Sequence, residues 1–437
     1  MSKQDGYRAV LKNKPFLSLW IAQIFSQLGD RVCFVVFVAI IAYNISTEAV
    51  YQSWLYIAFT IPAMMFTALA GVFIDRWNKK YTLITTNVLR GLIILFLPYF
   101  ESSLWGIYVI AFSISTVTQF FVPAEASCIP MLVEKKHLIS ANSLFTTTMM
   151  GSVIFGFVLG DPLINLFGIQ YVHYAITGLF VISAFCLIGV VEKKVAHDHD
   201  KVIKEFFEEF KEGLLYIKSS PIVLNAMLKL ATLFSTIVAL CILSISISTQ
   251  WLYPELPKLG AQKFAYIVAY SGLGMVIGAF LVGKFWRKKS KFLLIFMGFA
   301  IMGLSLMILS FTGLIPEKRI IQVPIIEFLG FHLKAFDLTI RMIYTYFIAT
   351  IIGFGAALVA IPVQTILQSS IPENMRGKVF GVQFTILSTS STLPVVIVAI
   401  GADMIGLLYM LLIIGVPLLI FGSIGLYRVR KKLKNLF

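Results

Sequence analysis

Charged residues are scarce in this sequence for its length. The chain has 437 residues, of which only 13% are charged and 59% are hydrophobic, and its mean hydropathy is +0.90. A soluble domain is about 25% charged and roughly 45–50% apolar. This composition excludes a set of soluble domains, and it excludes disordered and fibrous chains as well. We therefore expect an all-α membrane protein that crosses the bilayer many times.

Cysteine and histidine are also rare, with four and five residues respectively. All four cysteines fall within or at the edge of apolar segments, which predicts packing residues rather than a disulfide framework or a zinc site. No histidine forms a convincing nucleophile–base set with a buried cysteine or serine, so we expect a protein that is not an enzyme. The sequence has no phosphate-binding glycine loop, which excludes ATP as the energy source. We expect neither a cofactor nor a metal ion.

Apolar runs long enough to cross a bilayer are abundant, since a span needs about 20 residues. Twelve such runs lie between charged or turn-rich breaks. Their approximate limits are 16–43, 53–75, 81–100, 104–130, 143–167, 171–191, 221–250, 263–285, 291–312, 341–369, 379–402 and 406–427. Two of the breaks, 192–220 and 313–340, are much longer than the others.

Positive charge is distributed unevenly between the two sides of this predicted topology. If the N-terminus is cytoplasmic, the inward segments carry 27 of the 36 Lys and Arg residues and the outward segments carry six. Cytoplasmic loops of membrane proteins are enriched in these residues. The pattern predicts that both termini are cytoplasmic, and it explains the net charge of +15 without a nucleic-acid partner. We expect the protein in the cytoplasmic (inner) membrane of a bacterium.

Two sequence patterns recur in the second half of the chain. Pro123 and Glu134 near the end of the fourth run correspond to Pro362 and Glu373 near the end of the tenth, at an offset of 239 residues. A second pair follows the second and eighth runs at an offset of 212, and the external stretch at 313–340 accounts for the difference. We expect a six-helix half at 1–191, a cytoplasmic linker with an amphipathic helix at 192–220, and a second half at 221–437. Such duplication is typical of transporters, whose substrate path lies where the halves meet.

Polar side chains follow one face of the first predicted span. Gln23, Gln27 and Asp30 have i, i+4, i+7 spacing, and Arg31 borders this face. A polar stripe on an apolar helix favours a wet cavity over lipid. Two interpretations of Asp30 stay open: it carries a proton, or it is a permanent ion-pair partner of Arg31, Arg90 or Lys229.

Further ionisable and amide residues fall inside other predicted spans. Arg90 and Lys229 either bind an anionic group of a substrate or neutralise Asp30, Glu125 or Asp161. Glu125 is also a candidate gate or interface residue, close to Pro123. Gln119 and Gln364 are candidates for lining the cavity, and hydrogen bonding between helices is an equally good interpretation of them.

The decapeptide from Gly71 to Lys80, GVFIDRWNKK, resembles motif A of the major facilitator superfamily, and it lies between the second and third spans as that motif does. A narrower resemblance, carried by residues 123–144 and 362–381, is to the macrolide-efflux and enterobactin-exporter group, the drug:proton antiporter-3 family. The resemblance implies twelve helices in two pseudo-symmetric halves. It also implies that Gly71, Asp75 and Arg76 form a gating motif, and it adds Glu134, Glu373 and Arg376 as interface residues.

The chain departs from the family pattern at two points. The second copy of the motif has Arg287 where Asp is expected, so only the first half carries the complete gating motif. In the fifth span, Gly156 is followed by Phe157 rather than proline, and the proline comes at position 162.

The expected function is that of a secondary transporter that works by alternating access and exports an amphipathic small molecule in exchange for protons. The expected partners are that molecule, protons and the lipid bilayer, and the family resemblance favours a monomer. The alternatives are a lipid or lysophospholipid flippase or a uniporter of the same superfamily and, more remotely, a membrane enzyme or sensor without transport activity.

Overall fold

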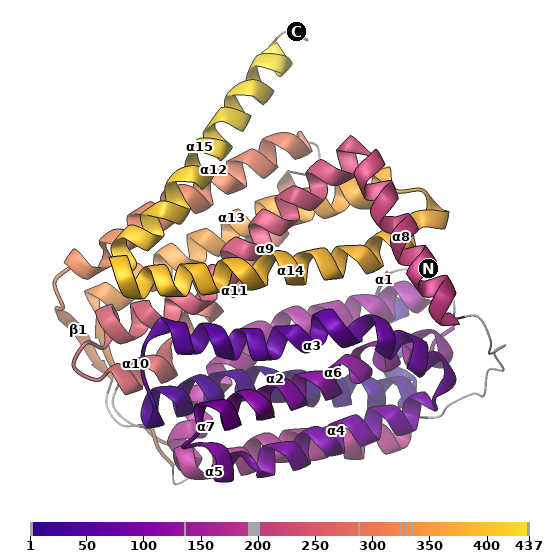
Figure 1. Ribbon diagram of the computed structural model, residues 1–437, viewed down its shortest axis with the longest axis horizontal. Helices are drawn as coiled ribbons and strands as arrows, with labels where there is room; N and C mark the ends of the chain where they lie inside the picture. The colour runs from indigo at the N-terminus through magenta and orange to yellow at the C-terminus, as the bar shows by residue number, and fades with distance from the viewer. Residues whose placement is uncertain are drawn as a thin grey trace. The chain divides into compact units, whose positions relative to one another are not determined.

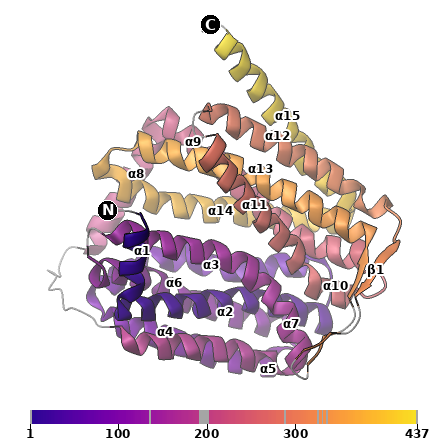
Figure 2. The ribbon, with the colours of Figure 1, turned by 180° about the vertical axis from the view of Figure 1, so that it is seen from behind.

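The computed structural model describes the chain except residues 1–2, 135–136, 191–201, 287–288, 324–325, 329–330, 334–335 and 435–437, and at some further positions it describes the backbone alone. The described chain is almost entirely helical and forms two compact units (Figures 1 and 2). The first unit contains residues 1–46 and 54–206, and the second contains residues 47–53 and 207–437.

The first unit is built from long helices that pack lengthwise. Helix α2 packs against α7, and α4 packs against both α6 and α7 (Figure 1). Its elements are α1 (Lys3–Lys12), α2 (Lys14–Asn44), most of α3 (Ala49–Arg76), α4 (Lys79–Leu95), α5 (Leu97–Phe100), α6 (Leu104–Leu132), α7 (Leu138–Cys186) and the short 3₁₀-helix η2 (Leu187–Gly189).

In the second unit, α12 packs against α13 and α15, α11 packs against α13, and α9 packs against α14 (Figure 2). Its helices are most of α8 (Val202–Ser219), α9 (Pro221–Ser246), η3 (Ile247–Leu252), α10 (Pro257–Lys263), α11 (Ala265–Phe285), α12 (Lys291–Ser310), η4 (Phe311–Leu314), α13 (Ile340–Ser370), α14 (Glu373–Ile405) and α15 (Leu407–Lys434). Its strands are β1 (Arg319–Val323), β2 (Ile326–Phe328), β3 (Phe331–Leu333) and β4 (Phe336–Thr339); β1 pairs with β4 and β2 with β3, both antiparallel.

Several helices begin where the sequence supplies a capping side chain. The side chains of Asn13, Asn78, Ser103 and Thr339 each accept a hydrogen bond from the backbone N–H three residues later. These bonds satisfy donors that the first turn of a helix leaves without partners. The caps fix the starts of α2, α4, α6 and α13, which carry most of the candidate site residues.

Each of the twelve apolar runs overlaps a helix. Among the described residues, ten helices are long and apolar enough to cross a membrane. One of these is α7, which contains the fifth and most of the sixth expected run and has a non-helical backbone at Gly168, where φ is 72°. The third expected run corresponds to α4 and α5; α4 has 17 residues.

The duplication seen in the sequence has a counterpart in the backbone. Gly168 and Gly406 have positive φ angles, and the second of them separates α14 from α15. They lie 238 residues apart, within one residue of the offset between Pro123 and Pro362. The two prolines also occupy corresponding helices, α6 and α13. Both halves therefore turn at an equivalent point between their fifth and sixth spans.

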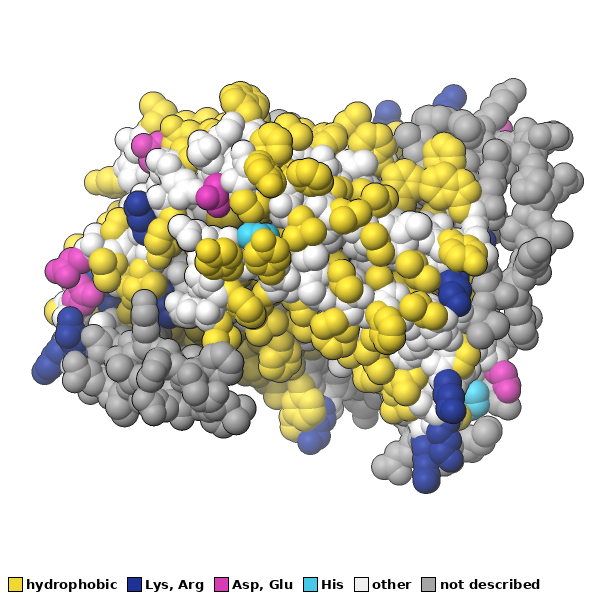
Figure 3. Space-filling model, turned by 90° about the horizontal axis from the view of Figure 1, so that it is seen from below, with side chains coloured by type: hydrophobic (Ala, Val, Ile, Leu, Met, Phe, Trp, Pro, Cys, Tyr) yellow, Lys and Arg dark blue, Asp and Glu magenta, His cyan; other side chains and the backbone are white. Residues whose placement is uncertain are grey.

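Many large apolar side chains of the described residues are exposed. Figure 3 shows hydrophobic side chains across the middle of one face, with most charged side chains towards its two ends. Large side chains such as those of Trp105, Phe155 and Phe185 are more than 70% exposed. A folded protein exposes so many large apolar groups where its surrounding solvent is lipid.

Helix α8 is amphipathic, as its sequence predicts, and it packs against other helices of the second unit. Ile217 is buried and Phe210 packs against the core of that unit, while Leu214 remains 47% exposed. Lys378 of α14 holds the opposite side of the helix, with its Nζ 2.6 Å from Glu212 Oε2. The side chains of Ile203, Phe206 and Phe207 lie outside the described residues.

Candidate functional site

A buried arginine forms the centre of the first unit's polar cluster. The Arg90 side chain, on α4, is fully buried, and its Nη1 lies 3.0 Å from Asp30 Oδ1 and 3.2 Å from Oδ2. Its Nη2 donates to Ser26 Oγ at 2.8 Å and to Asn87 Oδ1 at 2.7 Å. A guanidinium group in an apolar environment is stable only when paired and hydrogen-bonded, and these partners supply both.

Helical spacing brings these partners together. Ser26 and Asp30 are four residues apart on α2, and Asn87 precedes Arg90 by three residues on α4, so each pair shares a helix face. The site needs close packing of α2 against its neighbours. At Gly29, a Cβ atom would lie 3.0 Å from the ring of Phe180, which leaves little room for a side chain there.

Two phenyl rings complete the surroundings of Arg90. The Arg90 Cζ atom lies 4.6 Å from the ring centroid of Phe121 on α6 and 4.6 Å from that of Phe180 on α7. Both rings are buried. Cation–π attraction is strongest where water is excluded, so the rings stabilise the charge as well as filling the space around it.

A second carboxyl group lies beside this ion pair. Glu125 of α6 is 6% exposed, and its Oε1 atom is buried with no hydrogen-bond partner. It lies within electrostatic reach of both Arg90 and Asp30. The Nε atom of Arg90 is likewise buried without a partner. One cation is therefore paired with one acid while a second acid lies nearby.

The predicted polar stripe of the first span is divided in the structure. Asp30 contacts Arg90, whereas buried Gln23 donates from Nε2 to the Phe145 carbonyl of α7 at 3.4 Å. Gln27 and Arg31 are half-buried. Arg31 lies where α7 approaches closely, because a Cβ atom on Gly156 would be 2.6 Å from the Cβ of Arg31.

Gln119 and Gln364, the two candidates for lining the cavity, make contacts between helices. Gln119 of α6 accepts a hydrogen bond from Thr67 of α3 at 2.8 Å and donates to the Ser115 carbonyl at 3.0 Å. Gln364 of α13 accepts one from Gln383 of α14 at 3.3 Å. Both residues hydrogen-bond to side chains of neighbouring helices, and both are half-buried.

Lys229 of α9 has a different environment from Arg90. Its Nζ contacts the carbonyl of Asn225 at 3.4 Å and lies 5.9 Å from the ring centroid of Phe296. Among the described residues, no acidic side chain forms an ion pair with it. The sequence offered Asp30 as a partner for either cation, and the structure pairs Asp30 with Arg90.

The predicted gate residues are described unevenly. Glu134 is exposed just beyond the end of α6, and its carbonyl accepts a hydrogen bond from the His137 N–H at 2.8 Å. Gly71, Asp75 and Arg76 form the last turns of α3, and Glu373 and Arg376 the first turn of α14. The side chains at these five positions lie outside the described residues.

Sequence reasoning missed four residues of the cluster: Ser26, Asn87, Phe121 and Phe180. A signal for the first two is present, because each lies on the helix face of a charged residue it accompanies, at i+4 or i+3 spacing. No such signal marks the two phenylalanines among the 38 in the chain. Their role depends on how α4, α6 and α7 pack in three dimensions.

Comparison with known proteins agrees with this architecture. The family model described as Major Facilitator Superfamily matches residues 19–393. YfiS of Bacillus subtilis, named an uncharacterized MFS-type transporter, is 26% identical over 94% of this chain and 93% of its own length. Macrolide efflux protein A of Streptococcus pyogenes is 22% identical over 92% of each chain.

The fold also matches that of solved structures. The crystal structure of a point mutant of the nucleoside transporter NupG superposes with a TM-score of 0.73 over 94% of this chain and 99% of that one. The two sequences are 9% identical, so this similarity concerns the fold alone.

Proposed function

Because the chain belongs to the major facilitator superfamily of membrane transporters, we propose that it is a proton-coupled exporter of an amphipathic small molecule and works by alternating access. Full-length similarity to a macrolide efflux protein supports export over import. The class of substrate is part of the proposal: a molecule with a large apolar surface and at least one polar group, as macrolides, dyes and siderophores have.

The observation that carries the proton coupling is the group of Arg90, Asp30 and Glu125. In the described arrangement, Arg90 pairs with Asp30, whose side chain is 25% exposed, while Glu125 is buried without a partner for Oε1. An ionised carboxylate in that environment is costly, whereas a protonated carboxyl group is not. We therefore assign one proton to Glu125 in this state.

A proton-driven change follows from the presence of two acids and one cation. Protonation of the accessible Asp30 removes its attraction for Arg90, and Arg90 then favours ionisation of Glu125. The guanidinium group would exchange partners as the proton moves between the carboxyl groups. Such an exchange repositions α2 and α6 relative to α4, which is how proton movement would be linked to a change of conformation.

The setting proposed for this activity follows from the distribution of charge. We place the protein in the cytoplasmic membrane with both termini in the cytoplasm, because Lys and Arg are concentrated in the segments that this orientation places inside. We propose that the monomer is the transporting species. Cysteine labelling at the exposed Lys431 and Tyr99 positions, which are predicted to lie on opposite sides, would test the orientation.

The test is proton movement in inverted membrane vesicles that hold a pH gradient. Macrolides, siderophores, dyes and lysolipids are added one at a time to vesicles with wild type, Asp30→Asn or Glu125→Gln. We expect a compound-triggered proton flux in wild type and none in either variant. Glu208→Gln, at an exposed acid on α8, is the matched control and should behave as wild type.

Either of two results would overturn the proposal. One is a full pH-driven flux in both variants, which would exclude the carboxyl pair from coupling. The other is no response to any compound from wild type that is shown to be folded by size-exclusion chromatography. Transport of a lysolipid without proton movement would favour a flippase instead.

A further inference from the structure

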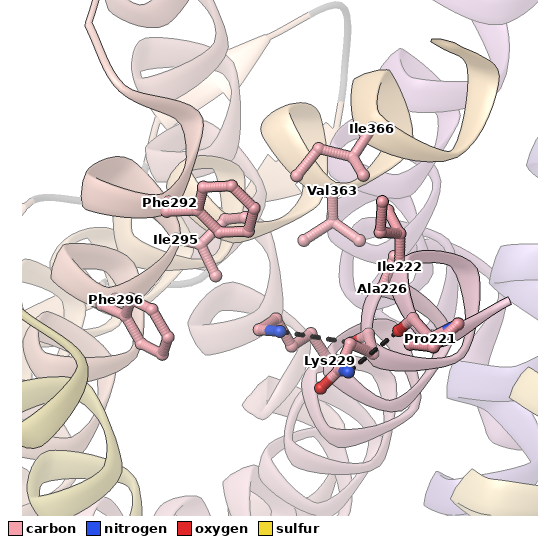
Figure 4. A pocket seen from close by; sticks show the side chains of 10 residues that line it. Pro221, Ile222, Ala226, Lys229, Phe292, Ile295, Phe296, Val363 and Ile366 are labelled. Atoms are coloured by element: carbon pink, nitrogen blue, oxygen red, sulfur yellow. Dashed lines mark hydrogen bonds between the residues drawn. The ribbon is translucent and has the colours of Figure 1, made fainter. Parts of the chain in front are cut away.

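A pocket of about 310 Å³ lies within the second unit, between α9, α12 and α13 (Figure 4). Its walls are mostly apolar. In Figure 4, Phe292 and Phe296 of α12 lie on one side and Ile222 of α9 on the other, with Val363 of α13 between Phe292 and Ile222 and Ile366 of α13 above. The walls and volume suit a hydrocarbon chain or another slender apolar group rather than a hydrated ion.

Two polar side chains line this pocket, and only one of them is charged. The Asn225 amide donates to the Pro221 carbonyl at 2.9 Å, so its N–H₂ group is turned back along its own helix. Lys229 is the charged one, and its ammonium has three donors. Its one hydrogen bond within the described chain is the long contact of 3.4 Å to the Asn225 carbonyl.

The positive charge of Lys229 is therefore not neutralised by the described part of the protein. The Phe296 ring provides a cation–π contact at 5.9 Å, near the outer limit for that interaction. An ammonium inside a membrane span is costly unless an anion or water compensates it. A group that brings a negative charge to Nζ would remove this cost and gain a charge-assisted hydrogen bond.

The position of Lys229 on its helix indicates what kind of anion reaches it. Lys229 lies eight residues after Pro221, the first residue of α9, which is about 12 Å along the helix. An inorganic anion at Nζ would leave the apolar walls of the pocket without contacts. An amphiphile would place its headgroup at Nζ and its chain on the apolar walls, so each part would meet a matching surface.

We propose that this pocket binds an anionic amphiphile, with a phosphate or carboxylate on Lys229 Nζ and an apolar chain against Phe292 and Phe296. The same chemistry is offered by anionic phospholipids of the bilayer and by free single-chain amphiphiles. The inference does not depend on proton-coupled export, because it rests on residues of α9, α12 and α13 and none of the Arg90 cluster.

The first experiment measures binding of dodecyl phosphate to the purified full chain in a neutral detergent by isothermal titration calorimetry. We expect Lys229→Gln to weaken binding about tenfold, the loss of one charge-assisted contact. Lys229→Arg should retain most of the affinity because it keeps the charge. Dodecyltrimethylammonium, with the same chain and the opposite charge, should not bind at the pocket.

Lys284→Gln is the matched control for these variants. Lys284 also lies close to a phenyl ring, 5.3 Å from that of Phe280, but it is exposed and does not line the pocket. We expect the affinity of the Lys284→Gln variant for dodecyl phosphate to equal that of wild type. Equal affinities in wild type, Lys229→Gln and Lys284→Gln, or equal binding of the cationic probe, would overturn the proposal.

Native mass spectrometry with phosphatidylglycerol and phosphatidylcholine distinguishes the two sources of the anion. Preferential retention of phosphatidylglycerol that Lys229→Gln abolishes and dodecyl phosphate displaces would identify a lipid site. Retention unaffected by Lys229→Gln, together with Lys229-dependent binding of dodecyl phosphate, would identify a site for free amphiphiles. Both results support an anionic amphiphile. Neither experiment measures proton flux, so both can succeed even if the proposed transport activity is wrong.

Discussion

Two cations inside apolar helices, Arg90 in the first unit and Lys229 in the second, are held in opposite ways. Arg90 is fully buried and has hydrogen bonds to three side chains and cation–π contacts with two rings. Lys229 is half-buried and makes one long bond to a backbone carbonyl. Both charges carry a desolvation cost. At Arg90, side chains of the protein offset the desolvation cost. At Lys229, the described side chains do not offset it, and a bound anion could.

The difference determines what each residue can do. A buried cation that is paired and hydrogen-bonded to side chains of its own protein contributes to folding. A cation without an acid contributes little to folding and much to the affinity for an anion. The same substitution at the two positions should therefore have very different effects on stability.

Removing each charge should give the largest contrast. Arg90→Met leaves Asp30 without its partner in a mostly buried site, and breaking such a pair destabilises by about 3–5 kcal/mol. Lys229→Met removes an uncompensated charge from an apolar wall and should change the free energy of unfolding by less than ~1 kcal/mol. Unfolding of both variants in mixed micelles measures the difference.

The double variant Asp30→Asn/Arg90→Met provides the control. It removes both charges, so it should recover part of the stability that Arg90→Met loses. Equal losses for Arg90→Met and Lys229→Met would contradict the comparison, because they would mean that the contacts of Arg90 contribute nothing beyond its charge.

Much of this architecture is predictable from local sequence. Each long apolar run became a helix because the bilayer leaves the backbone no other partners. The linker helix α8 was recognisable from its periodicity, and the repeated prolines located corresponding helices α6 and α13. Helix α7 is also divided where the sequence predicts a break between the fifth and sixth spans, because the backbone at Gly168 is not helical.

The candidate site was only half predictable. Asp30 and Arg90 stand out in the sequence because charges inside spans are rare. The choice among Arg31, Arg90 and Lys229 as the partner of Asp30 depends on the rotation and packing of helices far apart in sequence. The rotation and packing of the helices also decide that no acid of the described residues pairs with Lys229. From the sequence alone, several carboxyl groups were possible partners for it.

Exchanging arginine for lysine, or lysine for arginine, should change stability less than removing the charge, and again more at Arg90 than at Lys229. Arg90→Lys retains the charge but cannot contact Asp30, Ser26 and Asn87 together, and each lost bond to a charged group is worth about 1.5–3 kcal/mol. Lys229→Arg meets no fixed geometry and should be nearly neutral. Thermal unfolding of the two variants tests this, and a larger loss for Lys229→Arg would contradict it.

Gly29→Ala probes the packing around Arg90 without touching its hydrogen bonds. The added Cβ would lie 3.0 Å from the Phe180 ring, so the ring must shift away from its position over the guanidinium group. Overpacking of this kind costs about 1–3 kcal/mol. Gly178→Ala is the control, because a Cβ there has no neighbour within 4 Å. If both variants unfold together with wild type, the packing at Gly29 is looser than described.

The smallest expected effect concerns the rings beside each cation. Phe296→Leu removes a distant cation–π contact from the half-buried Lys229 and should lower the free energy of unfolding by about 0.5 kcal/mol. Phe121→Leu removes a cation–π contact from the fully buried Arg90 and should lower it by about 2 kcal/mol. Unfolding measurements give both values. The affinity for dodecyl phosphate is a second measurement that distinguishes the two variants, because Phe296 also forms a wall of the pocket and Phe121 does not. Phe296→Leu should therefore weaken ligand binding more than folding, and the reverse order would show that Lys229 is held as a structural cation like Arg90.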